Sequence, residues 1–337
     1  TRRALEMFGY GTPSAQLLSG TNRHLRELEE AISEFHGRAD TIVFSSGFAA
    51  NVGTITALIA EGDHIVVDEF SHASIQDAVD WSASRDVALY PHNDMSALRQ
   101  QLVAGEHRRS GGTLIVADGV FSMQGDLVDL PGLRSIADAH GAFLMLDEAH
   151  ATGVTGAGGR GTEEHFDCEG AIDVLMGTLS KAPGTVGGYI SGSEDLVTHL
   201  RFFARTAMFS TSLPAAICAG AAEAFRIMAK DPEPRERLWE NVRLMEDGLR
   251  SAGFRIPAAQ SPILPVPVGD GDKLVSISRD LYEKGVRCAG VSFPAVPMGA
   301  EILRVTLNAR HTREDVERGI DALTETGRKH GLLGHPM

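Results

Sequence analysis

The sequence predicts an α/β protein whose large domain is built on a mostly parallel seven-stranded sheet between helices. Apolar runs rich in Val, Ile and Phe alternate with amphipathic stretches over the first two thirds of the chain, and turn residues separate them. The expected strands are Thr41–Ser46, His64–Phe70, Asp86–Pro91, Thr113–Gly119, Phe143–Glu148, Val174–Ser180 and Gly187–Ser191.

Helices are expected where apolar residues recur at helical spacing between these runs. One stripe ends at Gly37 and consists of Leu25, Leu28, Ile32 and Phe35. Another helix is expected from Pro131 to Gly141, because proline favours the first turn of a helix and glycine its end.

A smaller α+β domain is expected at the C-terminal end. A helix-like stretch, Leu213–Lys230, leads to the break Lys-Asp-Pro-Glu-Pro at 230–234, after which strands become fewer. We place the large domain at residues 1–226 and the small one at 227–337. The small domain should contain helices at Asp272–Gly285 and Thr312–Gly331, the second of which opens with a capping pattern.

Length and charge exclude several classes of protein. The chain has 337 residues, too many for a short peptide scaffold, and 45 Asp and Glu against 31 Lys and Arg give a formal net charge of −14. This negative field argues against a nucleic-acid partner. No apolar run reaches the ~20 residues of a membrane span, and the start lacks the apolar core of a signal peptide. We therefore expect a soluble, cytoplasmic protein.

The cysteines and histidines predict no metal site. Cys168, Cys218 and Cys288 form no C-x-x-C pair, and the 13 histidines show no H-x-x-x-H spacing, so we expect reduced thiols. Thr1 is not an initiating methionine, so the chain is expected to be a domain of a longer polypeptide or one without its N-terminal arm.

Two short motifs resemble nucleotide-binding signatures without their context. Gly156–Gly161 fits G-x-G-x-x-G, but several residues separate it from the preceding strand, whereas a dinucleotide fingerprint joins a strand directly to its helix. Asp147–His150 spells the acidic box of some helicases, yet the chain has no Gly-Lys dipeptide and hence no P-loop.

Lys181 is the candidate nucleophile. Of the five lysines, it alone follows an apolar strand and precedes a loop of small residues. Such a lysine, partly desolvated, is available as a neutral amine for a carbonyl, and small neighbours leave room for a planar cofactor. The alternative is a lysine that merely extends from the end of a strand.

A carboxylate precedes this lysine at the end of another strand. Asp147 ends the apolar run that starts at Phe143, and it could keep a pyridine nitrogen protonated, which makes pyridoxal phosphate (PLP) an electron sink. His150 could reach the phenolic oxygen of that ring. The alternative is an ordinary helix-capping aspartate.

Three further segments fit the same cofactor. Ser45–Asn51, which includes Gly47 and Phe48, joins a strand to a helix and offers backbone N–H groups to a phosphate. His72 follows a strand and could stack on a ring, although a structural hydrogen-bonding role is the commoner one. Phe209–Ser212 offers hydroxyls, or simply caps a helix.

Together these segments resemble the α-oxoamine synthases, which are fold-type I PLP enzymes. The resemblance spans nearly the whole chain and rests on the following segments: Leu18–Thr21, Ser46–Asn51, Ser71–Ser74, His92–Asp94, Gly119–Asp126, Leu146–His150, Gly158–Gly161, Gly177–Ala182, Phe209–Pro214 and Leu303–Leu307.

The resemblance implies a role for each matching residue. Lys181, His72, Asp147 and His150 would be the catalytic set: Lys181 would carry PLP, Asp147 would pair with its ring nitrogen, and His72 would stack on the ring. The remaining cofactor contacts would come from Ser122 at the phenolic oxygen and from Gly47, Phe48, Thr178, Ser210 and Thr211 at the phosphate, the last two from the other subunit. Arg304 would bind the amino-acid carboxylate.

The implied function is decarboxylative condensation of a small amino acid with an acyl thioester in a homodimer. The acyl donor is either a coenzyme A ester or an acyl carrier protein, and glycine, alanine and serine are all open as acceptors. Pro13 and Gln16 stand where the family has Gly and Arg, which bears on acyl-donor recognition. The alternatives are an aminotransferase of the same fold and a structural partner subunit, which usually lacks the lysine.

Overall fold

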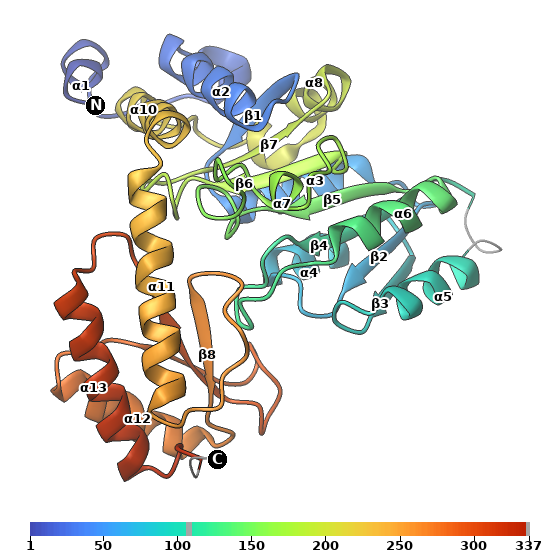
Figure 1. The fold of residues 1–337 in the computed structure, drawn as a ribbon. Coiled ribbons are helices and arrows are strands. Elements are labelled where there is room, and N and C mark those ends of the chain that lie inside the picture. Colours follow the sequence, from blue (N-terminus) through green and yellow to red (C-terminus); the bar gives the residue numbers. More distant parts are fainter. Residues whose placement is uncertain (106–109, 335–337) are drawn as a thin grey trace. The chain divides into compact units, whose positions relative to one another are not determined.

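The computed structural model describes residues 1–105 and 110–334 and divides into two compact units (Figure 1). Unit 1 contains residues 1–120 and 128–231, and unit 2 contains residues 121–127 and 232–337. The predicted boundary between residues 226 and 227 remains a prediction about domains, because a division by contacts does not test independent folding.

Unit 1 is built on a seven-stranded sheet with the order β1-β7-β6-β5-β4-β2-β3. Only β7 runs antiparallel to its neighbours, so the predicted mostly parallel sheet is confirmed. The strands are β1 (Asp40–Phe44), β2 (His64–Asp68), β3 (Asp86–Tyr90), β4 (Thr113–Asp118), β5 (Phe143–Asp147), β6 (Val174–Thr178) and β7 (Gly188–Gly192).

Helices cover both faces of this sheet, with α6 on one face and α3 on the other (Figure 1). Unit 1 contains α1 (Arg2–Phe8), the π-helical turn η1 (Gln16–Gly20), α2 (Arg23–His36), α3 (Gly47–Leu58), α4 (Ala73–Asp80), α5 (Met95–Gly105), α6 (Leu130–His140), α7 (Thr162–His165), α8 (Glu194–Phe203), α9 (Arg205–Met208) and α10 (Ala215–Lys230). The helices predicted from the Leu25 stripe, at 131–141 and at 213–230 are confirmed as α2, α6 and α10.

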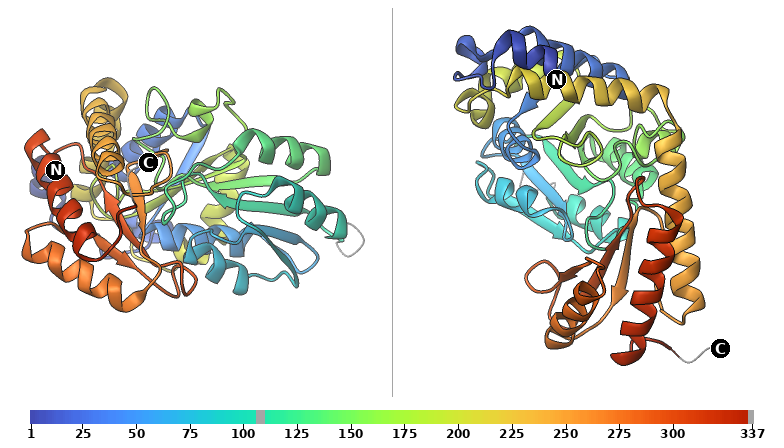
Figure 2. Two further views of the ribbon diagram at one scale, coloured as in Figure 1. Left: turned by 60° about the horizontal axis from the view of Figure 1, so that its bottom comes forward. Right: turned by 90° about the vertical axis from the view of Figure 1, so that its left-hand side faces the viewer.

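The ends of α2 follow from its sequence. The Asn22 side chain accepts hydrogen bonds from the amides of His24 and Leu25, and Gly37 ends the helix in the left-handed conformation, at φ 66°. The apolar stripe of α2 packs on α10, which runs beside it in Figure 2, and the rings of Phe35 and Phe225 meet edge to face at 5.3 Å.

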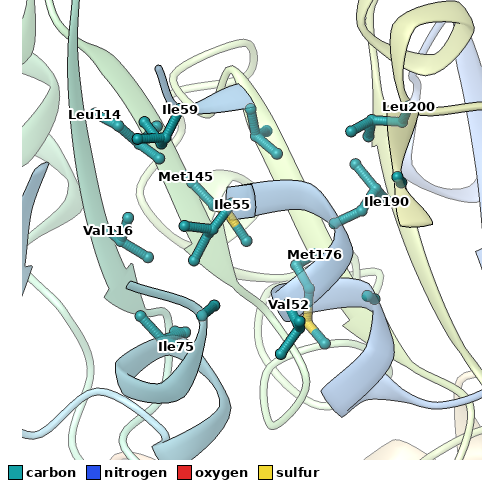
Figure 3. Packing of buried hydrophobic residues seen from close by; sticks show 14 of the residues in the cluster. Val52, Ile55, Ile59, Ile75, Leu114, Val116, Met145, Met176, Ile190 and Leu200 are labelled. Atoms are coloured by element: carbon teal, nitrogen blue, oxygen red, sulfur yellow. The ribbon is translucent and has the colours of Figure 1, made fainter. Parts of the chain in front are cut away.

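The main core of unit 1 lies between α3 and the sheet. Figure 3 shows Ile55 of α3 near Met145 of β5, and Val52 near Met176 of β6. Alternate residues of each strand point to this layer, as the two-residue period of a strand requires. This packing holds the N-terminus of α3 at the end of the sheet where the parallel strands finish.

Unit 2 is an α+β unit with a three-stranded antiparallel sheet of order β8-β10-β9. Its strands are β8 (Ile263–Pro267), β9 (Ala289–Val291) and β10 (Ile302–Thr306), and its helices are α11 (Glu233–Ser251), α12 (Gly271–Glu283) and α13 (Arg313–Lys329). The predicted helices at 272–285 and 312–331 are confirmed, and Thr312 and Asp315 form the predicted capping box. Among the described residues, no helix is both long and apolar enough to cross a bilayer.

Candidate active site

Three buried carboxylates end neighbouring parallel strands of unit 1. Asp68 ends β2, Asp118 ends β4 and Asp147 ends β5, and Asp118 and Asp147 are direct cross-strand partners. Burial raises the pKa of Asp118 well above its usual value, and the charge of Asp147 raises it further. The carboxyl end of the sheet is therefore an acidic edge formed by Asp68, Asp118 and Asp147.

Asp147 is fixed through both carboxylate oxygens. Its Oδ1 accepts a hydrogen bond from the amide of Ala149 at 2.9 Å, and its Oδ2 accepts one from Asn51 Nδ2 at 2.8 Å. The sequence correctly predicts this carboxylate at the end of a buried strand. The partner from α3 was not predicted.

Lys181 lies in the loop between β6 and β7, close enough to the acidic edge to affect Asp118 electrostatically. The positive charge of Lys181 lowers the pKa of Asp118, against the larger effect of burial. The residue is exposed in this single chain, and the partial desolvation expected for it stays a prediction. Its small neighbours in the loop, Ala182 and Gly184, are exposed as well.

The N-terminus of α3 lies against the end of β6. A Cβ placed on Gly47 would lie 3.2 Å from Thr178 Oγ1, and one on Gly188 would lie 2.7 Å from the Gly47 nitrogen. The Ser46 hydroxyl accepts a hydrogen bond from the amide of Ala49 at 3.0 Å, which caps the helix. The glycines thus leave a narrow space beside a helix N-terminus and the Thr178 hydroxyl, while the Phe48 side chain is exposed.

His72 precedes α4 and His150 follows β5. The His72 ring caps α4, because its Nδ1 accepts a hydrogen bond from the amide of Ser74 at 3.2 Å, and the residue is exposed. Its own amide donates to Asp118 Oδ1 at 3.0 Å, which attaches it to the acidic edge. His150 is half-buried, three residues after Asp147.

Ser122 and Arg304 meet within unit 2. The Nε of Arg304, on β10, donates to the carbonyl oxygen of Ser122 at 2.6 Å. Burial lowers the pKa of Arg304 from its usual value. The contact leaves the terminal nitrogens of the guanidinium fork for other acceptors.

Ser210 and Thr211 follow α9 and adjoin the N-terminal segment. Thr211 forms an isolated antiparallel bridge with Ala15, and the amide of Ser212 donates to the carbonyl of Ser14 at 2.9 Å. Their predicted contact with a phosphate in the other subunit remains a prediction.

Asn51, Ser74 and Asp118 are site residues that sequence reasoning did not single out. Asn51 is completely buried and is a polar residue on an otherwise apolar first half of α3. That pattern is a usable signal, because a buried amide needs partners. Ser74 lies within the segment Ser71–Ser74, and Asp118 lies within the predicted strand Thr113–Gly119, but neither was assigned a role.

Comparison with known proteins gives the family. Residues 11–323 match the model of the aminotransferase class I and II family. The chain is 42% identical over 333 residues to an 8-amino-7-oxononanoate synthase of Geobacter sulfurreducens and 40% identical over 332 residues to one of Symbiobacterium thermophilum, covering 98% of this chain and 84% of each relative. The chain belongs to the α-oxoamine synthase family.

The solved structures agree with this assignment. A serine palmitoyltransferase with a PLP internal aldimine superposes with a TM-score of 0.94 at 34% identity, covering 98% of this chain and 83% of the other. The enzyme from Sphingomonas wittichii gives 0.94 at 35%, covering 99% and 83%. The chain therefore has the fold-type I architecture, and its cofactor is PLP.

This α-oxoamine synthase is a PLP-dependent acyltransferase. Its reaction condenses a small amino acid with an acyl thioester, with loss of carbon dioxide, to an α-amino ketone. The donor set fits the cofactor: a lysine amine suits its aldehyde, the buried carboxylate of Asp147 its ring nitrogen, and the glycine-lined helix N-terminus beside Thr178 its phosphate.

Proposed function

We propose that this synthase joins alanine to a seven-carbon dicarboxylic acid activated as a thioester. The support is the product name of the relatives. In 8-amino-7-oxononanoate, carbons 8 and 9 are those that alanine keeps after losing its carboxylate, and carbons 1 to 7 come from an acyl donor that ends in a second carboxylate. The observation that carries the proposal is 40–42% identity to such enzymes over 98% of the chain.

Lys181 and Asp147 carry the proton chemistry in this proposal. When bound, PLP supplies the electron sink for the negative charge that forms at the amino-acid Cα. The amine of Lys181 would hold the cofactor and, when free, would act as the base that takes the Cα proton of the amino acid. The Asp147 carboxylate would pair with the ring nitrogen of the bound cofactor and favour its protonated form.

The other residues bind and orient. His72 would stack on one face of the cofactor ring, and Ser122 and His150 would contact the side that bears the phenolic oxygen. Arg304 receives the carboxylate of the amino acid, a task that suits a planar guanidinium.

The phosphate is held by backbone amides and hydroxyls. The amides of Gly47 and Phe48 at the start of α3 and the Thr178 hydroxyl would bind it from one subunit. Ser210 and Thr211 reach it from the partner subunit, so the proposed enzyme is a homodimer.

The acyl donor and the location belong to the same proposal. The thioester is carried by coenzyme A or by an acyl carrier protein. The two donors are distinguished by supplying the same acyl group on each and comparing the rates.

A cytoplasmic location is supported by the three cysteines, none of which forms a disulfide. Cell fractionation with an antibody to the protein tests this location.

The test is an amino-acid panel with the seven-carbon thioester. Carbon dioxide release and ketone formation are measured with alanine, serine and glycine, in the wild type and in Lys181→Ala. The proposal predicts the highest kcat/KM with alanine and no turnover in the variant. Preference for serine or glycine would refute the proposed amino acid. Keto-acid formation without carbon dioxide release would indicate an aminotransferase.

A further inference from the structure

Asn51 connects two parts of the site that come from different strands. Its Nδ2 lies 2.8 Å from Asp147 Oδ2 and 2.9 Å from Ser74 Oγ, and both Asn51 and Ser74 are 0% exposed. An ionised carboxylate only accepts hydrogen bonds, so the amide nitrogen and not the amide oxygen must face Asp147. The two hydrogens of Nδ2 are thereby used, one on each partner.

The amide oxygen of Asn51 supports this interpretation. Oδ1 is buried and has no hydrogen-bond partner among the described residues. An unsatisfied buried acceptor is unfavourable, and a leucine of similar volume would avoid it. The amide at this position is therefore explained by what its nitrogen donates to.

Ser74 extends the connection to His72. Its Oγ lies 2.8 Å from His72 Nδ1, and its amide donates to the same nitrogen at 3.2 Å. Since Ser74 Oγ accepts from Asn51, its single hydroxyl hydrogen is directed to His72. Nδ1 thus accepts two hydrogen bonds and carries no proton, so the neutral ring has its proton on Nε2.

The backbone of His72 is held as well as its ring. Its amide donates to Asp118 Oδ1, on the strand next to the one that ends in Asp147. The acidic groups facing His72 are thus Asp118, through the backbone, and Asp147, through the bridge. Backbone and ring are fixed from two adjacent strands.

We propose that Asn51 and Ser74 are positioning residues that hold the Asp147 carboxylate and the His72 imidazole in one hydrogen-bonded bridge, with the imidazole neutral and protonated on Nε2. This inference rests on the proposed function, in which Asp147 pairs with the ring nitrogen of PLP and His72 stacks on that ring. A neutral imidazole stacks on a cationic ring without charge repulsion, and the bridge sets that state together with the position of the carboxylate.

The test is the state of the His72 ring, which does not depend on activity. Long-range ¹H–¹⁵N spectra of histidine-labelled protein are recorded with and without PLP at one fixed pH, and they show which ring nitrogen of each histidine carries a proton. His72 is assigned from its loss in His72→Gln. We expect Nδ1 to be unprotonated in the wild type.

Four variants separate the bridge from general effects of mutation. Ser74→Ala and Asn51→Leu should move the His72 Nδ1 resonance toward that of an imidazole nitrogen without a donor. Ser74→Thr, which keeps the hydroxyl, should resemble the wild type. Thr54→Val is the matched control, because Thr54 is a buried polar residue on the same helix outside the bridge, and it should change nothing.

Cofactor affinity supplies the second readout. Asn51→Leu should weaken PLP binding about tenfold or more, as expected for losing a hydrogen bond to a charged group. A proton on Nδ1 in the wild type, or an unchanged His72 resonance in Ser74→Ala, would overturn the bridge even if PLP binds normally. Absence of PLP binding by the wild type would instead refute the proposed function, and with it the cofactor-directed part of the inference.

Discussion

Asp118 and Asp147 are cross-strand neighbours at the carboxyl ends of β4 and β5, and both are buried. The fold thus places two aspartates side by side, although the proposed function needs only the carboxylate of Asp147, to pair with the cofactor ring nitrogen. Burial and the charge of Asp147 raise the pKa of Asp118, so Asp118 retains its proton at a higher pH than an exposed aspartate. Within the pair, Asp118 is therefore the group whose protonated form is favoured.

The first prediction concerns stability and Asp118. Because its pKa is higher in the folded than in the unfolded state, the folded protein binds the extra proton, and stability falls as pH rises above the unfolded value of about 3.9. Asp118→Asn keeps a neutral side chain that can accept from the His72 amide, so this decline should shrink. Urea unfolding at several pH values measures the free energy of unfolding of wild type and variant. If this free energy falls with pH equally in both, the raised pKa of Asp118 is contradicted.

The second prediction concerns acid and His36. His36 is buried, its Nδ1 donates to the Arg160 carbonyl at 3.1 Å and its Nε2 accepts from the Tyr189 hydroxyl at 2.9 Å. Burial lowers the pKa of His36 from 6.5 to about 3, so the folded state excludes a proton that the unfolded state binds.

Stability from His36 is therefore complete above pH ~6.5 and lost as pH falls toward 3, by about 2 kcal/mol at pH 5. His36→Gln should remove much of this acid sensitivity. The measurement is the free energy of unfolding at pH 7.5 and at pH 5. If wild type and His36→Gln lose the same free energy between these pH values, His36 is not the source of the acid sensitivity.

The third prediction concerns the close approach of Gly188 to α3. A methyl group there would lie 2.5 Å from the Ser46 carbonyl oxygen and 2.6 Å from Gly47 Cα, both backbone atoms. Gly188→Ala should displace the start of α3, cost about 1–3 kcal/mol, and weaken PLP binding. Gly271→Ala is the control, since nothing lies within 4 Å of that position. Thermal unfolding and PLP titration are carried out on both variants. Equal melting temperatures and equal PLP affinities in the two variants would refute the steric explanation.

The fourth prediction concerns the charge of Asp147. Asp147→Asn keeps the shape of the side chain but removes the charge beside the cofactor ring nitrogen. It should retain PLP and lose turnover by about a hundredfold or more. PLP absorbance and steady-state rates test this, and wild-type turnover would contradict the proposed role of the carboxylate.

The sequence predicts a helix or strand well where a local pattern of apolar residues is enough to identify it. The strands of unit 1 other than β7 are visible because each contains a short apolar run, and α2 is visible because its apolar stripe ends at Gly37. Unit 2 is harder. Its β8 contains Pro265 and Pro267, and β9 has only three residues, so neither gives a strand-like pattern.

The same distinction applies to the site. Asp147 and Lys181 are predictable because each follows an apolar strand. The contact between Asn51 and Asp147 is not, because it joins residues 96 positions apart and depends on how α3 packs on the sheet.

The most direct test of the account is to find which amine binds the cofactor. The chain offers five lysines, and the protein loaded with PLP is reduced with borohydride, digested and analysed by mass spectrometry. The account predicts the phosphopyridoxyl group on the peptide that contains Lys181. A label on Lys230, Lys273, Lys284 or Lys329, or on none of the five, would contradict it.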